Sequence, residues 1–352
     1  MSTTVYKCPS CDAPLTYSAK TGKFVCDYCV SSFTEQEVQE LWEKKEQKQP
    51  RAQESKASDS GEDGEARVFV CSQCGAEVVT DENTAATHCS FCHNPAIISE
   101  RLSGEFKPSR VIPFAIDKKA AEGMFLTYLK GRPFLPKSFK YTAKKDKLTG
   151  LYAPFWLFGT NAEAKLIANA ENVRVHRVGN KEITERDHYA VERAANMSFD
   201  NLPVDASERL DDRLMELIEP YEYSGVKDFS MSYLSGFFAE KYDETAQEVA
   251  PRAQKRFEDY AQKETLKTIT GYSSVSVQNA DVVLSDVATD YLLLPVWMMN
   301  YKYKEKTYTF AINGQTGRMV GKLPVSALRI FAWGAAIFAA VFLAAFLGGM
   351  LL

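Results

Sequence analysis

The chain has no excess of positive charge. Its 352 residues include 42 lysines and arginines against 46 aspartates and glutamates, a net charge of −4. Residues 1–48 hold six basic and seven acidic residues, and residues 67–107 hold three and five. A protein that binds nucleic acid needs a basic surface for the phosphates. Neither segment offers one, since Lys7, Lys20 and Lys23 are too few, so we do not expect nucleic-acid binding.

Motifs for catalysis are also lacking. The sequence contains no G-x-S-x-G nucleophile elbow, no H-E-x-x-H metal motif, no phosphate loop and no dinucleotide fingerprint. Only four histidines occur, and His176 and His188 lie in a polar stretch typical of surface residues. The acidic group Glu208, Asp211 and Asp212 falls on the solvated face of a predicted helix. We therefore expect no enzyme activity and no small-molecule substrate.

Cysteine is scarce, but its arrangement is regular. The eight cysteines form four C-x2-C pairs, and the second set of four repeats the first at an offset of 63 residues. Four thiolates at this spacing form two knuckles that close a tetrahedral site around one Zn²⁺. The sequence therefore predicts two zinc ribbons, and thus two zinc ions, with these ligands: Cys8, Cys11, Cys26, Cys29, Cys71, Cys74, Cys89 and Cys92.

The ligand set decides what the metal does. Four cysteines leave no open coordination position, so each zinc is expected to be structural. A ribbon of about 30 residues buries too little core to fold alone, so metal binding supplies much of its folding free energy. Two alternatives stay open from the sequence. The cysteines could form disulfides, and His88 or His93 could replace a cysteine, or His93 could hydrogen-bond to a thiolate.

The C-terminal residues 330–352, IFAWGAAIFAAVFLAAFLGGMLL, carry no charge. A helix of this length would cross a hydrocarbon core about 30 Å thick. Arg318, Lys322 and Arg329 precede it, which by the positive-inside rule places the bulk of the chain in the cytoplasm. The sequence thus predicts a tail-anchored, single-pass membrane protein. A buried helix and a cleaved lipid-anchor signal are the alternatives.

The remaining segments indicate a multi-domain chain. Residues 1–33 form ribbon 1, and residues 34–48 form a short helix with a capping box from Thr34 and Glu37. Residues 49–67 are polar and are expected to be a flexible linker. Residues 68–104 form ribbon 2, and residues 105–325 form an α+β domain with an antiparallel sheet.

Within the α+β domain, helices are expected at residues 117–131, 207–218 and 244–267, with Pro251 kinking the last one or marking its start. Strands are expected at 151–167, broken by a turn at 159–161, and a meander at 291–320 that turns at Glu305-Lys306. The stretches APFW (153–156) and LPVW (294–297) resemble each other. This leaves two interpretations, one undivided domain or two related halves.

The motif order carries a family resemblance: KCPSC…FVCDYC, CSQCG…HCSFCH, IPFAID, YAPFWLF, LLPVWMMNYKYK…NGQTG and a terminal apolar segment. It resembles a family of bacterial membrane-anchored proteins with transcription-factor-IIB-type zinc ribbons. That resemblance implies partners similar to phage-shock protein A and to SPFH-type (virion-core-like) proteins, and a role in envelope stress. We therefore predict a membrane adaptor that recruits soluble proteins to the cytoplasmic face. The alternative is a membrane-associated regulator or replication accessory protein that binds nucleic acid through its ribbons.

Overall fold

A computed structural model describes residues 3–46, 67–71, 74–90, 92, 94–136, 138–139 and 148–350. The chain forms two compact units from interleaved segments. Unit 1 comprises Met1–Ala153, Leu210–Lys241 and Leu293–Leu352, and unit 2 comprises Pro154–Arg209 and Tyr242–Leu292. Strands β9 (Thr149–Val178) and β13 (Ser274–Tyr303) contribute residues to both units. Residues 49–66 of the predicted linker lie outside the described residues.

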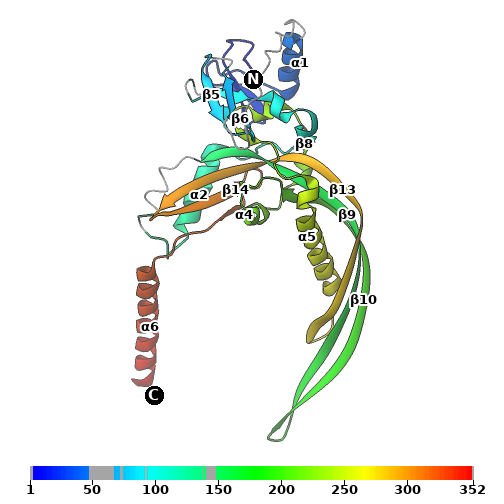
Figure 1. The fold of residues 1–352 in the computed structure, drawn as a ribbon. Coiled ribbons are helices and arrows are strands. Elements are labelled where there is room, and N and C mark those ends of the chain that lie inside the picture. Colours follow the sequence, from blue (N-terminus) through cyan, green and yellow to red (C-terminus); the bar gives the residue numbers. More distant parts are fainter. Residues whose placement is uncertain are drawn as a thin grey trace. The chain divides into compact units, whose positions relative to one another are not determined.

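Ribbon 1 is a three-stranded antiparallel sheet of β1 (Leu15–Ser18), β2 (Lys23–Cys26) and β3 (Ser32–Phe33). Helix α1 (Glu35–Glu46) follows it (Figure 1). The Thr34 N–H donates to the Glu37 carboxylate at 2.7 Å, and the Glu37 N–H donates to the Thr34 hydroxyl at 3.4 Å. This is the expected capping box. The Trp42 ring of α1 lies 4.8 Å from the Tyr6 ring, which fixes the helix to the ribbon.

Ribbon 2 is built into the large sheet of unit 1. Its first hairpin is β4 (Arg67–Val70) and β5 (Glu77–Thr80), and its second is β6 (Thr84–His88) and β7 (Pro95–Ile97). Two short 3-10 turns follow, η1 (Ser99–Leu102) and η2 (Gly104–Phe106). Strand β12 (Phe238–Glu240) pairs with β6 on one side and with β9 on the other. Because β12 joins them, ribbon 2 and the α+β domain share one sheet.

Further elements complete unit 1, which has an aromatic core. They are β8 (Arg110–Val111), α2 (Lys118–Lys130), α4 (Asp212–Leu217), η3 (Tyr223–Gly225), β11 (Lys227–Asp228), η4 (Met231–Leu234), β14 (Lys306–Asn313), β15 (Met319–Gly321) and α6 (Ala327–Met350). The Phe114 ring stacks on Phe237 at 4.2 Å and lies 4.9 Å from the Trp297 ring. Lys304 and Glu305 both have positive φ and form the β13–β14 turn, one residue before the predicted position.

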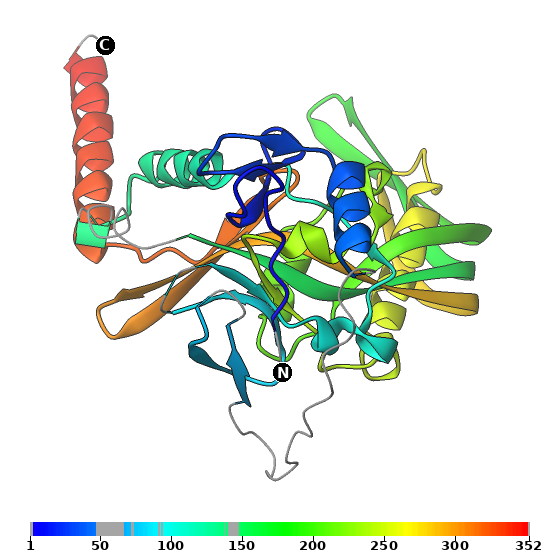
Figure 2. The ribbon, with the colours of Figure 1, turned by 90° about the horizontal axis from the view of Figure 1, so that it is seen from above.

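Unit 2 is a curved antiparallel sheet with one helix along its face. Strand β10 (Lys181–Asp205) pairs with β9 along its length, and a turn at Gly179-Asn180 joins the two strands. Helix α5 (Ala246–Lys267) lies along these strands (Figures 1 and 2). Alternate residues of β9 are buried, and most of them are alanine: Ala162, Ala164, Leu166, Ala168 and Ala170. The small side chains let the helix approach the sheet closely.

One expectation for unit 2 is wrong, and one of the two alternatives for Pro251 is excluded. Strand β9 runs through residues 159–161 without a turn. Gly159 lies beside an irregularity where the pairing with β10 shifts between Phe199 and Leu202, so the glycine marks a bulge. Pro251 lies inside α5 and does not mark its start, because the capping box of Thr245 and Glu248 begins the helix earlier.

The predicted transmembrane helix at 330–352 is wrong. A span needs about 20 consecutive apolar residues in one helix. Within the residues that the structure describes, no helix is both long enough and apolar enough to cross a membrane. The same finding contradicts two further predictions, the single-pass membrane location and the membrane as a partner. Helix α6 begins at Ala327, and Arg329 in its first turn donates to the Pro133 and Leu135 carbonyl oxygens at 2.9 and 2.7 Å.

Candidate metal centres

Four thiols converge in each ribbon, with their sulfur atoms all within 4.8 Å of one another. The Sγ–Sγ distances are 3.5 Å for Cys8–Cys29 and Cys11–Cys26, 3.8 Å for Cys71–Cys92 and 3.7 Å for Cys74–Cys89. Sulfurs bound to one tetrahedral zinc at about 2.3 Å lie about 3.8 Å apart. A disulfide would need about 2.05 Å, and none of the eight cysteines forms one. The geometry therefore fits two four-thiolate metal sites of the kind that zinc occupies.

The knuckles share one backbone pattern. In each, the N–H of the first cysteine donates to the carbonyl oxygen five residues later, at 2.7–2.9 Å: Cys8 to Ala13, Cys26 to Ser31, Cys71 to Ala76 and Cys89 to Asn94. The residue just before that acceptor has positive φ in three knuckles, at Asp12 (59°), Val30 (60°) and Gly75 (73°). The fourth equivalent, His93, lies outside the described residues. The tight left-handed turn brings the two thiols of each pair together.

Burial divides each pair in the same way. The first cysteine of every pair is buried, while the second is exposed or half-buried. Phe24 and Phe69 are 0% and 1% exposed and form the ribbon interiors beside the buried thiols. Each metal position therefore lies at the edge of a small core, and the outer thiols close it from the solvent side.

Individual thiols differ in acidity, and in ribbon 1 the pKa of Cys11 is raised to about 12 while that of Cys29 is lowered. The Ser31 hydroxyl, whose Oγ lies 3.2 Å from the Cys29 sulfur, and then the Ser31 N–H lower the pKa of Cys29 to about 6. Burial raises the pKa of Cys92 to about 12. Because thiolates bind the metal, loading must displace protons, and metal affinity falls at low pH.

Histidine does not join either group among the described residues. The His88 ring lies 5.3 Å from the Phe238 ring of β12, on the side where ribbon 2 joins the sheet. His176 is exposed in β9. His188 in β10 lies at the surface, with its Nδ1 3.2 Å from the Glu171 carboxylate. The structure therefore assembles no catalytic pair from these two histidines.

One short segment, residues 231–240, holds both ribbons, and the sequence did not reveal it. The Tyr17 N–H of β1 donates to the Ser235 carbonyl oxygen at 3.1 Å, and the Tyr17 ring lies 5.2 Å from the Tyr233 ring. The same segment continues into β12, which pairs with β6 of ribbon 2. A direct bridge between Thr4 and Ile97 also joins the two ribbons, at 2.8 and 3.2 Å. The two metal sites therefore belong to one assembly.

This assembly contains a groove between the ribbons and the core of unit 1. It consists of two adjoining cavities of about 450 and 870 Å³ that share Thr16, Asp27 and His88. The smaller also contacts Tyr28 and Cys92, and the larger is lined by residues that include Tyr17, Asp117, Lys118, Phe237, Phe238 and Trp297. We call this feature the ribbon groove. It offers aromatic surface, two carboxylates and a lysine.

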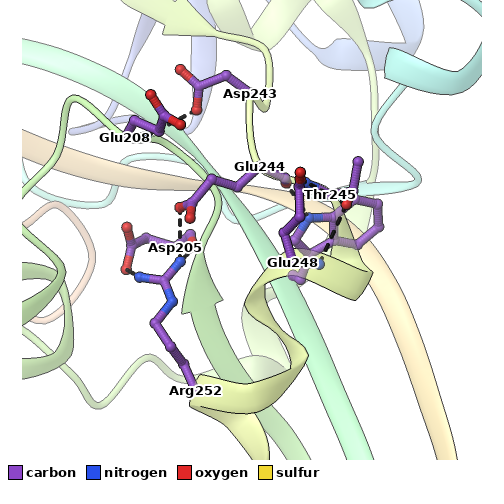
Figure 3. Close-up of polar contacts among 8 residues, drawn as sticks. Asp205, Glu208, Asp243, Glu244, Thr245, Glu248 and Arg252 are labelled. Carbon is purple, nitrogen blue, oxygen red and sulfur yellow. Dashed lines mark hydrogen bonds and ion pairs between the residues drawn. The ribbon is translucent and has the colours of Figure 1, made fainter.

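A second polar cluster lies where α5 starts in unit 2 (Figure 3). Asp205 is 2% exposed, and Arg252 lies 3.5 Å from its Oδ1 and donates to the Glu244 carboxylate at 2.8 Å. The Trp156 indole N–H donates to the Glu244 carbonyl oxygen at 3.0 Å. The group holds no histidine or nucleophile, and the arginine neutralises the buried carboxylate. Its role is to fix α5 to β10.

The acidic residues singled out in the sequence lie apart from the metal sites. The Glu208 N–H donates to the Asp243 carboxylate at 2.9 Å. Asp211 caps α4, since its carboxylate accepts from the Leu214 N–H at 3.0 Å. Asp212 is exposed in the first turn of α4. These contacts define local structure and no reaction centre.

Comparison with known proteins gives one full-length relationship. No family model matches the chain, and no solved structure matches it. The uncharacterized protein YdjG of Bacillus subtilis (strain 168) is 37% identical over 344 residues, which cover 96% of this chain and 95% of YdjG. At this identity and coverage, the chain belongs to the same family as YdjG.

Proposed function

We propose that the protein is a zinc-ribbon adaptor that binds partner proteins in the ribbon groove. The observation that supports this is the arrangement itself: two metal sites hold the two sides of one groove, and neither site offers an open coordination position. Structural zinc in this place serves to keep a binding surface in shape. Recruitment would then depend on metal loading.

The chemistry of the groove favours a protein over a nucleic acid. Its aromatic lining suits apolar and aromatic side chains, which dominate the centres of protein interfaces. Asp27 and Asp117 outnumber Lys118 among its charged residues, so phosphate groups would be repelled. The nucleic-acid alternative gains no support from these residues.

Two parts of the sequence-based hypothesis remain predictions. The resemblance implies a setting in envelope stress, and the motif search predicts that the chain is not an enzyme. The proposed recruiting role does not require a membrane span.

The test is affinity purification of the full-length protein with mass spectrometry and a zinc measurement. The variant Tyr28→Glu places charge in the groove at a side chain that is 77% exposed. Tyr260→Glu is the matched control, since Tyr260 is 39% exposed on α5 and does not line the groove. We expect proteins that copurify with wild type and Tyr260→Glu to be lost with Tyr28→Glu, while both variants keep two zinc ions per chain.

Two results would overturn the proposal. One is an unchanged set of partners with Tyr28→Glu. The other is nuclease- and salt-sensitive recovery of nucleic acid with the wild-type protein, which would favour the regulator alternative.

A further inference from the structure

We propose that the outer edge of β13 in unit 2 binds an extended, lysine- or arginine-rich segment of a partner protein by strand addition. One apolar side chain of that segment would enter a pocket beside α5. This surface is separate from the ribbon groove and adds a second docking site to the chain.

The first observation is an open sheet edge. In unit 2, β13 pairs with β9. The other partners of β13 lie further along the strand: β14 pairs with it from Val296 onward, and β8 is followed by Ile112, whose N–H donates to the Leu293 carbonyl oxygen. Within the part of the chain that the structure describes, no strand covers the outer side of residues 274–285. Their outward N–H and C=O groups form a template for an added strand.

The second observation is an apolar pocket at this edge. It has a volume of about 260 Å³, and α5 and β13 supply most of its lining: Ala250, Ala253, Gln254, Phe257, Val282, Leu284 and Val287, with Phe158 from β9. The alanines of α5 leave the space open, and Val287 is 59% exposed at its mouth. Side chains of an added strand would point alternately to the two faces of the sheet. One on the α5 face would lie beside Val282 and Leu284.

The third observation is charge. Residues 274–290 contain Asp281, Asp286 and Asp290 but no lysine or arginine. Exposed edges are usually protected by charged side chains, lysine above all, and β10 follows this rule with Lys181 and Arg186 among its acidic residues. Asp281 and Asp286 are exposed on the β13 edge, whereas Asp290 is partly buried, so the exposed charge is negative, which attracts a basic segment and repels an acidic one.

The same charge argues against a second copy of this chain as the occupant. Antiparallel pairing of two β13 edges in a register centred near Asp281 would place the two Asp281 carboxylates close to each other, where like charges are destabilising. Asp286 also has positive φ (54°) and interrupts the regular strand, so the usable edge ends near Ser285. A short basic segment fits this length better than a long self-paired strand.

The experiment measures fluorescence anisotropy of a labelled peptide with the zinc-loaded, full-length protein at low salt. The peptide alternates lysine with valine around one central leucine. A glutamate version and a proline-containing version of equal charge are the control peptides. We expect only the lysine peptide to bind.

The affinity for the lysine peptide should fall by about tenfold with Val287→Arg and by about threefold with Asp281→Lys. Glu192→Lys, on the open edge of β10, should leave this affinity unchanged.

Amide hydrogen exchange then locates the peptide. We expect slower exchange in residues 274–285 and no change in β10 or the ribbons. Equal affinity for the three variants, or binding of the proline peptide, would overturn the proposal. Slower exchange in other residues on peptide binding would also overturn it. So would slower exchange of residues 274–285 in the absence of peptide that increases as the protein dimerises. Because the ribbons take no part, loss of this site would leave the proposed groove function intact, and the reverse also holds.

Discussion

The Tyr233 hydroxyl donates a hydrogen bond to the Glu35 carboxylate, 198 positions away in the chain. Glu35 is the first residue of α1, which follows ribbon 1 in the chain, and Tyr233 belongs to the segment that continues into β12. Lys227 adds to the same place, with its Nζ 3.9 Å from the Glu35 carboxylate. The ribbon and the sheet are therefore held together by a buried phenol with an acidic partner.

Replacing this phenol should loosen ribbon 1 without unfolding it. Tyr233 is 1% exposed, and Tyr233→Phe keeps its ring while removing a hydrogen bond to a charged acceptor, worth about 1.5–3 kcal/mol. We expect the free energy of unfolding to fall by this order in urea titration. Tyr303→Phe, which loses a hydrogen bond to the Ser138 hydroxyl at 2.8 Å, is the control and should have a smaller effect because that hydrogen bond is exposed to solvent.

Alkaline pH should destabilise the packing of Tyr17, which lies against Tyr233. Burial, and then the nearby Glu35, raise the pKa of Tyr17 from 10.0 to about 12. As pH rises, the unfolded chain loses the phenolic proton first, so the stability from this group is complete below pH 10 and is lost between about pH 10 and 12. Urea midpoints measured across this range should fall less steeply for Tyr17→Phe. Equal slopes for variant and wild type would contradict this assignment.

Each four-cysteine group should bind one zinc ion, and each ion should be lost separately when its own group is disrupted. The full chain should bind two zinc ions, and Cys26→Ser or Cys89→Ser should each reduce this to one by mass spectrometry under native conditions. A chelator should remove both ions, and the ribbon strands should then unfold. A single zinc in the wild-type protein would exclude one of the sites.

Val30 is a strained residue in the second knuckle of ribbon 1. It is β-branched, has φ of 60° and is 80% exposed, so it has little packing to offset the strain. Val30→Gly should therefore stabilise the ribbon by about 1 kcal/mol, measured as slower zinc loss to a chelator. Val79→Gly, at an exposed position in β5, should destabilise ribbon 2 instead.

The buried carboxylate of unit 2 gives a further test. Arg252→Met leaves Asp205 without its cation, and breaking such a pair costs about 3–5 kcal/mol. The double variant Asp205→Asn with Arg252→Met should recover part of this loss, because no buried charge remains. Lys255→Met, at an exposed site on α5, should change urea stability little. A full loss in the double variant would show that packing, and not charge, is responsible.

The sequence alone determined the parts that depend on neighbouring residues. Cysteine spacing predicted both four-thiol groups, because a knuckle needs only a few residues and one tight turn. The capping box at Thr34 and the start of a helix at Asp117 were predicted for the same reason. Local patterns also gave a wrong prediction, because Gly159 was predicted to lie in a turn and instead lies at a bulge. The apolar run at 330–352 predicted a membrane span that the described helix does not support.

Tertiary structure decided how these parts are joined. Nothing in the residues around Tyr233 or Ser235 indicates that they meet Glu35 and Leu15, because such pairings depend on the whole sheet. The same holds for β12, a three-residue strand between ribbon 2 and β9, and for the Asp205–Arg252 pair. Local chemistry therefore specifies the metal ligands, whereas long-range strand pairing determines the groove and the open edge at which we propose that partners bind.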